Sequence, residues 1–223
     1  PELYLDFDLG TPFAERDTLP RTSQQPLSLN HKKNTYVGVH TFTSTGTHRI
    51  SMEDPNRNAG ILNIWPGGNS DDIVFALESF LIISPVLGAS GGNSSVQFTE
   101  CPCPAVGCVN TSYCYNPMGY DPDGDSLSYE LVIPLGTGAL PLILGNFYVF
   151  PDAVGGGNLN IDPINGTVCW NNPMLVGEYN FTIKIFKWRN GYLIGSVLRD
   201  VQLTIKNNCN NNPPYISPIS DPC

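Results

Sequence analysis

Three aspartates stand at alternate positions of one short loop, at Asp121, Asp123 and Asp125. Carboxylates this close repel one another unless a cation neutralises them. Ca²⁺ prefers such ligands and gathers about six to eight oxygens at about 2.3–2.6 Å. Gly124 permits the tight turn between the aspartates, and Glu130 or a linker carbonyl would complete the shell. We predict a calcium site of Asp121, Asp123, Asp125 and Glu130; the alternative is a polar turn that binds only water.

A strand follows this loop directly. Residues 126–133 alternate polar and apolar side chains, which is the period of a half-buried strand. The loop departs from the EF-hand pattern, because the Asp-x-Asp-x-Asp-Gly order and the final Glu are missing and no helix pattern flanks it. The predicted metal site therefore lies where a loop meets a sheet.

The seven cysteines are a second group of candidate reactive residues. They are Cys101, Cys103, Cys108, Cys114, Cys169, Cys209 and Cys223. Disulfides, a zinc site and free thiols are the three states they could take. The spacing lacks the paired C-x₂-C of zinc sites and any nearby histidine, so we expect disulfides and an oxidising compartment. The pairing cannot be read from the spacing, and the odd number leaves one cysteine over, for which Cys223 is the candidate.

No recognisable active site appears in the chain. The Gly-x-Ser-x-Gly, His-Glu-x-x-His and phosphate-loop patterns are absent, and His31, His40 and His48 are distant in sequence from the cysteines. Glu178 and Asp162 have no spacing that predicts the carboxyl pair of a glycosidase. We therefore expect that the protein is not an enzyme.

Trp188 is the candidate residue for contact with a ligand. It ends an alternating strand between Lys187 and Arg189, whereas Trp170 follows Cys169 and is expected to pack in the core beside a disulfide. An exposed indole can stack on a sugar ring. A carbohydrate-binding module is therefore the alternative function.

The composition argues against two classes of partner. The net charge is −9 and the chain has only 11 Lys and Arg residues, so the phosphate backbone of a nucleic acid is not an expected partner. No apolar run reaches the length of about 18 residues that marks a membrane-spanning helix. We expect neither nucleic-acid binding nor a membrane span.

The apolar pattern predicts an all-β protein made of many short strands. We expect strands over residues 2–9, 34–43, 47–52, 61–65, 72–83, 127–133, 147–150, 159–162, 168–170, 177–188, 192–197 and 199–206. Residues 10 to about 30 form a polar, Pro-containing stretch, and Asn165-Gly166 and Asn190-Gly191 are expected tight turns. No amphipathic helix pattern appears. We predict tandem antiparallel β-sandwich domains of the Ig-like or cadherin-like type. The domains are residues 1–98 and 99–207, and residues 208–223 form a linker toward a following module.

Two resemblances to known families add to this prediction. The stretch from Asp121 to Tyr129 resembles the Asp-x-Asp start of cadherin-like bacterial domains, which implies Ca²⁺ at the junction between modules. A set of longer phrases together resembles gliding-motility-associated surface proteins, which are long, modular and type IX-secreted. These phrases are DPNRNAG at 54–60, NPMGYDPDGD at 116–125, GEYN at 177–180, IGSVLRD at 194–200 and NNNPP at 210–214.

The resemblance implies a structural or adhesive segment of a secreted cell-surface protein. Ca²⁺ would stiffen its β-sandwich modules within a stalk or filament. The expected partners are neighbouring modules of the same protein, with glycans, surface proteins or further copies of the chain as alternatives. Besides the carbohydrate-binding module, the other alternative function is a fibre subunit that assembles end to end by donating a strand.

Overall fold

The computed structural model describes residues 2–28, 31–55, 57–85, 92–99, 105–143, 147–207 and 209, and this part of the chain is all-β, as predicted. The strands are β1 (Glu2–Phe7), β2 (Glu15–Ser28), β3 (His31–Tyr36), β4 (Gly46–Asp54), β5 (Phe75–Ile83), β6 (Gln97–Phe98), β7 (Ala105–Cys108), β8 (Tyr113–Tyr115), β9 (Gly119–Tyr120), β10 (Ser126–Val132), β11 (Leu135–Gly136), β12 (Leu140–Pro141), β13 (Asn158–Ile161), β14 (Val168–Asn171), β15 (Gly177–Arg189) and β16 (Tyr192–Lys206). The described helices are short: η1 (Ser70–Asp72), η3 (Thr137–Ala139) and α1 (Pro151–Gly155).

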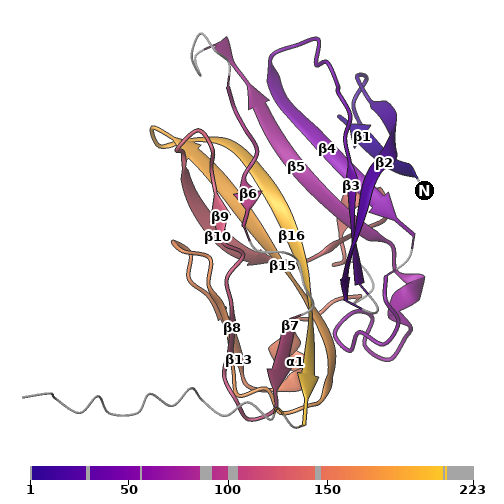
Figure 1. Ribbon diagram of the computed structural model, residues 1–223, viewed down its shortest axis with the longest axis vertical. Helices are drawn as coiled ribbons and strands as arrows, with labels where there is room; N and C mark the ends of the chain where they lie inside the picture. The colour runs from indigo at the N-terminus through magenta and orange to yellow at the C-terminus, as the bar shows by residue number, and fades with distance from the viewer. Residues whose placement is uncertain are drawn as a thin grey trace, which may run out of the picture.

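One large sheet runs through both halves of the chain (Figure 1). Its order is β10-β15-β16-β5-β4-β1-β2-β3, and neighbouring strands along it are antiparallel. The pairing of β5 with β16 places Ser79 opposite Val197 and Leu81 opposite Gly195. β5, from residues 1–98, and β16, from residues 99–207, therefore belong to one sheet, in which backbone groups along the edge of β5 find hydrogen-bond partners in β16.

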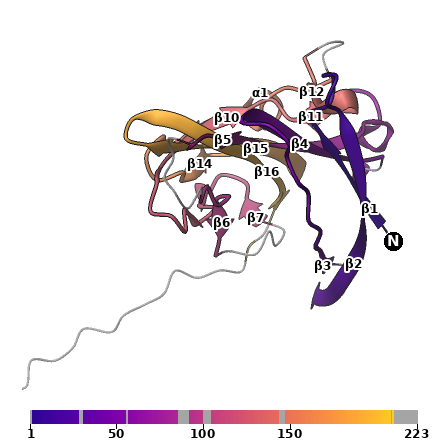
Figure 2. The same cartoon turned by 90° about the horizontal axis from the view of Figure 1, so that it is seen from above.

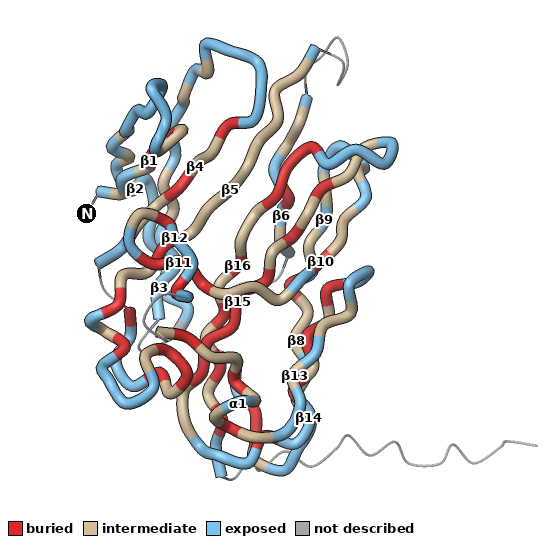
Figure 3. Tube along the Cα trace, turned by 180° about the vertical axis from the view of Figure 1, so that it is seen from behind, coloured by how far each residue is buried: buried red, intermediate tan, exposed pale blue. Residues whose placement is uncertain are grey.

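The hairpin of β15 and β16 supplies the centre of the main hydrophobic core. On β15, the alternate residues Tyr179, Phe181, Ile183 and Ile185 are each at most 1 % exposed, within a strand that is largely buried (Figure 3). They pack with side chains of the small sheet β13-β14-β8, including Trp170, which is 1 % exposed. The turn between the two strands has Asn190 at φ 52° and Gly191 at φ 81°, the left-handed conformation that a two-residue turn of this kind requires.

A buried polar network also joins the two halves. Asn63 is 0 % exposed; its Nδ2 donates to the Asn180 carbonyl at 2.8 Å, and its Oδ1 accepts the Asn180 N–H at 2.8 Å. Nearby, Arg57 Nη2 donates to the Leu135 carbonyl at 2.9 Å, and Arg57 Nη1 lies 3.5 Å from Asp200 Oδ2. Burial raises the pKa of Asp200. Because buried polar groups cost free energy when they are unpaired, these bonds fix residues 57–63 against β15 and β16.

Two disulfides tie together the later part of the chain. Cys114–Cys169 joins β8 to β14 at directly opposed positions, with a Cα–Cα distance of 4.2 Å. Cys108–Cys209 joins the end of β7 to the chain just after β16, at a Cα–Cα distance of 6.0 Å and across 101 residues of sequence. Cys101, Cys103 and Cys223 lie outside the described residues, as does most of the predicted linker 208–223. The disulfides confirm the predicted state of these cysteines and suggest an oxidising, extracellular environment.

β2 and β3 form a long hairpin arm that curves away from the body of the protein (Figure 2). No strand was predicted between residues 9 and 34, but Glu15–Ser28 forms one continuous strand. Most side chains of this strand are exposed on both faces, so the apolar alternation that identifies a half-buried strand is missing. The strand predicted over 34–43 ends at Tyr36, and the one predicted over 61–65 consists only of isolated bridges.

Candidate functional site

Asp121, Asp123 and Asp125 meet at the turn that leads into β10, and we call these three residues the acidic corner. Asp121 shapes the turn, because its Oδ1 accepts the backbone N–H groups of Asp123 at 2.9 Å and Asp125 at 3.2 Å. Gly124 takes a left-handed conformation at φ 82°. One carboxylate oxygen from each aspartate lies within 4.8 Å of the other two. The predicted clustering is confirmed, and the acidic corner could hold a metal ion.

The side chain of Lys187 enters the acidic corner from β15. Its Nζ lies 2.9 Å from Asp121 Oδ2, 3.2 Å from Asp123 Oδ2 and 3.1 Å from Asp125 Oδ2. The same Nζ donates to the Ser94 carbonyl at 2.5 Å. The Lys187 side chain is 2 % exposed and the Asp121 side chain is 0 % exposed. This ammonium group thus supplies, from within the chain, the positive charge that the sequence argument assigned to Ca²⁺.

Arg189 binds the outer side of the acidic corner. Its Nε and Nη2 each donate to one oxygen of Asp125 at 2.7 Å, a bidentate pair. This bond lowers the pKa of Asp125 below its usual value, and the Ser94 N–H bond does the same for Asp123. Burial alone would lower the pKa of Lys187, but hydrogen bonds to the three carboxylates outweigh it and raise that pKa. The three pKa shifts each favour the charged form of the side chain, which is the carboxylate for the aspartates and the ammonium for Lys187.

The acidic corner also holds a segment from the first half of the chain. The Ser94 N–H donates to Asp123 Oδ2 at 2.6 Å, and its hydroxyl donates to Asp123 Oδ1 at 3.0 Å. Arg189 Nη1 donates to the Gly92 carbonyl at 3.1 Å. Asn93 Nδ2 donates to one backbone carbonyl of β5 and one of β16. We call Ser94, Lys187, Arg189 and the acidic corner together the clasp, because they tie residues 92–94 to the sheet.

Glu130, the fourth predicted metal ligand, lies apart from the acidic corner. It is exposed on β10 and stands opposite Lys184 of β15. The group of described carboxylates that could hold a metal ion contains the three aspartates and does not include Glu130. Successive strand residues point to opposite faces of a sheet, so Glu130 lies on the face opposite to that of the buried Tyr129.

Trp188, the predicted ligand contact, is half-buried on β15. Its Nε1 donates to Ser128 Oγ at 2.8 Å, and its ring centroid lies 6.4 Å from that of Phe186. The indole N–H therefore already has a partner within the chain, and only part of the ring is open to a ligand.

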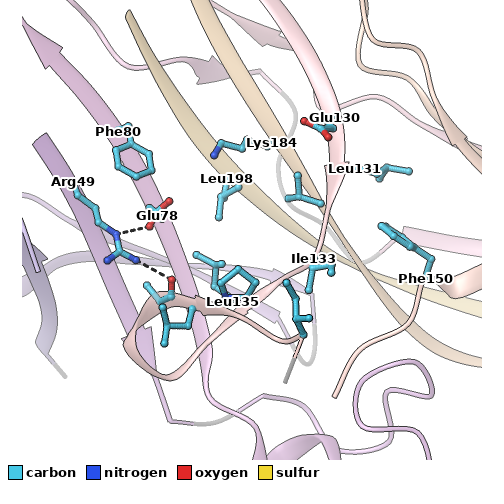
Figure 4. Close-up of a pocket in the computed structure, with 15 residues that line it drawn as sticks. Arg49, Glu78, Phe80, Glu130, Leu131, Ile133, Leu135, Phe150, Lys184 and Leu198 are labelled. Atoms are coloured by element: carbon cyan, nitrogen blue, oxygen red, sulfur yellow. Dashed lines mark hydrogen bonds and ion pairs between the residues drawn. The ribbon is translucent and has the colours of Figure 1, made fainter. Parts of the chain in front are cut away.

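A cavity of about 720 Å³ opens on the same face as Glu130 and Lys184 (Figure 4). Its floor is the large sheet, and residues 133–143, which contain β11, η3 and β12, form its wall. Apolar side chains make up most of the lining: Phe80, Leu131, Val132, Ile133, Leu135, Ala139, Leu140, Pro141, Ile143, Phe150 and Leu198. Small-molecule sites in proteins measure about 300–1,000 Å³, so this cavity has the size of a ligand site.

The charged side chains that line the cavity differ in their partners. Arg49 Nε donates to Glu78 Oε2 at 2.5 Å, and Arg49 Nη2 donates to a backbone carbonyl of η3 at 2.8 Å. Lys184 Nζ instead lies 5.6 Å from the ring centroid of Phe80 and 5.3 Å from that of Phe186. Among the described residues, Lys184 Nζ forms neither an ion pair nor a hydrogen bond.

Sequence reasoning missed Lys187, Arg189 and Ser94 as members of the site. Lys187 follows Ile185 at the next inward position of an alternating strand, so the pattern did carry a signal for it. A lysine on a core-facing position requires a counter-charge. Ser94 carried no such signal, because its partners Asp123 and Lys187 are distant in sequence.

Comparisons with known proteins leave the function open. The sequence matches no model of a known protein family, and no curated protein matches it at a significant level. In the described part of the chain, no helix has the length and apolar character needed to cross a membrane.

Proposed function

We propose that this chain is a structural segment of an extracellular surface protein, and that the clasp locks its two halves into one unit. The observation that carries the proposal is the Lys187 ammonium, buried among three carboxylates and the Ser94 carbonyl. Removing one partner of such a buried ion pair typically costs about 3–5 kcal/mol. The arrangement fixes the positions of three chain segments relative to one another.

Two further observations support an extracellular, modular role. Both described disulfides favour an oxidising compartment. The phrases shared with gliding-motility-associated surface proteins support a position within a long surface-exposed stalk. Neighbouring modules of the same protein are then the expected partners.

The disulfide Cys108–Cys209 determines where tension would act in such a stalk. The acidic corner and Lys187 lie between these two cysteines in sequence, so a force applied to the chain ends passes across the disulfide and bypasses them. Ser94 precedes Cys108 and therefore lies on the path of the force. The clasp therefore connects the part of the chain that carries the applied force to the segment that the disulfide shields from that force.

Calcium binding at the acidic corner is the second candidate, and the mutual distance of the three carboxylates favours it. An ion at that position would have to displace the Lys187 ammonium, which lies 2.9–3.2 Å from the same oxygens. A ligand that binds only the folded form stabilises it by mass action. Stabilisation of the unmodified chain by Ca²⁺ would therefore distinguish calcium binding from the purely structural role of the clasp.

Force spectroscopy on the oxidised chain tests the structural proposal. Lys187→Met should lower the force that detaches residues 92–94, because the cation between Ser94 and the acidic corner is lost. Lys32→Met, on the exposed arm, is the matched control and should leave that force unchanged. If the force that detaches residues 92–94 were equal in the unmodified chain and in Lys187→Met, the proposal would be contradicted.

A further inference from the structure

We propose that the cavity above Lys184 binds an amphipathic organic carboxylate, with its apolar part inside the cavity and its carboxylate on the Lys184 ammonium. This site is independent of the clasp. Lys184 and Lys187 are an odd number of residues apart on β15, so their side chains point to opposite faces of the sheet. A ligand at Lys184 would therefore leave the contacts of Lys187 unchanged.

The shape and the lining of the cavity favour a ligand with a sizeable apolar part. Side chains of the sheet, such as Leu198, line one side, and the segment 133–143 lines the other. Leu140 and Ile143 of this segment are 60 % and 61 % exposed although they border the cavity. An apolar ligand would cover part of this surface, which is favourable at about 25 cal/mol per Å² removed from water.

The charges around the cavity select an anionic head group. Arg49 and Glu78 already neutralise each other, and Arg49 also binds a backbone carbonyl. Figure 4 shows the Lys184 ammonium turned toward Phe80 and away from Glu130. Its contacts among the described residues are two aromatic ring faces, so all of its hydrogen-bond donors remain for a ligand. Glu130 is exposed at the rim, where water solvates its charge.

The carboxylate of a ligand would therefore bind at the ammonium end of the Lys184 side chain. Lys184 is half-buried, and a charge-assisted hydrogen bond there is stronger than a neutral one. The flanking rings of Phe80 and Phe186 hold the ammonium by cation–π contact, which reduces the loss of side-chain freedom when a ligand binds.

Titration with decanoate, followed by methyl NMR of the full chain, tests this proposal. We expect saturable shifts of the Leu198, Leu140 and Ile143 methyl signals. Decan-1-ol, which has the same alkyl chain without the charge, should bind at least about tenfold more weakly, as expected for the loss of one charged hydrogen bond. Lys184→Met should weaken decanoate binding by a similar factor and leave decan-1-ol binding unchanged.

Two control variants make the outcome unambiguous. Glu130→Gln should bind decanoate at least as tightly as the unmodified chain, because it removes a nearby negative charge. Leu198→Trp should fill the floor of the cavity and abolish binding of both probes, and thermal melting checks that each variant is folded. No saturable binding of decanoate, equal affinity for decanoate and decan-1-ol, or an unchanged affinity in Lys184→Met would each overturn the proposal. None of these variants touches the clasp, so this result is independent of the unfolding force.

Discussion

Burial disfavours the charged form of Lys187, whereas the neighbouring carboxylates favour it. Moving an ammonium group out of water costs several kcal/mol, and the attraction of nearby carboxylates offsets this cost only when the geometry is close. At Lys187, carboxylate oxygens at 2.9, 3.1 and 3.2 Å and a carbonyl at 2.5 Å surround the Nζ. Arg189 adds a second positive charge, so the acidic corner keeps one net negative charge. Ca²⁺ would therefore compete with two cations that the chain itself holds in place.

Acidification should weaken the clasp. The pKa of Asp125 is lowered from its usual 3.8, chiefly by the Arg189 hydrogen bond. A carboxyl whose folded-state pKa is lowered contributes stability above its unfolded pKa and loses that contribution as the pH falls through the folded value. We expect the free energy of unfolding to fall below about pH 4, and to fall less steeply in Asp125→Asn. Urea unfolding over a pH series measures both slopes.

The comparison of the two slopes is needed because Asp123 and Asp8 also have lowered pKa values, so the stability that they contribute falls over the same pH range. Burial alone would raise the pKa of Asp8, but hydrogen bonds from His48 and from the Arg49 N–H outweigh it and lower that pKa. This contribution is the same in the unmodified chain and in Asp125→Asn. Identical slopes in the two proteins would show that Asp125 adds no pH-dependent stability.

At the scale of elements, the β2–β3 arm ends in an exposed edge strand. Such an edge offers unpaired backbone groups to another chain. The pairing of the arm is interrupted by register shifts between Arg21 and Ser23 and between Pro26 and Ser28. Lys32 and Lys33 place positive charges along the exposed edge of β3. Irregular pairing, proline and lysine are the features by which natural proteins prevent edge-to-edge association.

We therefore predict that the arm does not assemble copies of the chain into a fibre. Light scattering after size exclusion should give a monomer over a wide range of protein concentrations. The double variant Lys32→Val and Lys33→Val removes the edge charges and should associate more readily. A polymer formed by the unmodified chain would contradict this prediction and support the fibre alternative.

At the scale of the whole molecule, Asn63 joins the two halves more tightly than its position in a loop suggests. Its amide pairs with both backbone groups of Asn180 in the interior. Asn63→Ala leaves these two groups without their partner, so we expect a loss of about 3 kcal/mol of unfolding free energy. Asn58→Ala, at an exposed pair with Gln202, should change stability by less than about 0.5 kcal/mol. Urea unfolding measures the loss of stability in each variant. Equal losses in Asn63→Ala and Asn58→Ala would show that Asn63 does not hold the two halves together.

The long disulfide loop should limit how far the oxidised chain can be extended. Cys108–Cys209 spans 101 residues, and Cys114–Cys169 closes 55 of these, so at about 3.3–3.6 Å per residue the reduction of both bonds should add about 330–360 Å to the extended length. Force spectroscopy with and without reductant measures this difference. An unchanged extended length would mean that neither bond forms in the protein in solution.

Much of the strand content could be predicted, and the reasons for the failures are physical. β15 and β16 each have one apolar, buried face, so apolar side chains recur at alternate positions, and the Asn190-Gly191 turn has its own local signature. β2 buries neither face and leaves no periodic signal. The clustering of the three aspartates followed from their spacing, whereas the Ser94 contact and the cavity wall at 133–143 come from contacts between distant segments that no local pattern encodes.

Thermal unfolding of the unmodified chain and of Lys187→Met, each in chelator and in millimolar Ca²⁺, shows whether the Lys187 ammonium takes the place of a metal ion at the acidic corner. We predict the same midpoint for the unmodified chain in both solutions. Lys187→Met should lose about 3–5 kcal/mol, and Ca²⁺ should restore part of the loss because the carboxylates then lack their ammonium. A midpoint that rises with Ca²⁺ in the unmodified chain, or a Lys187→Met variant that melts like it, would contradict the account.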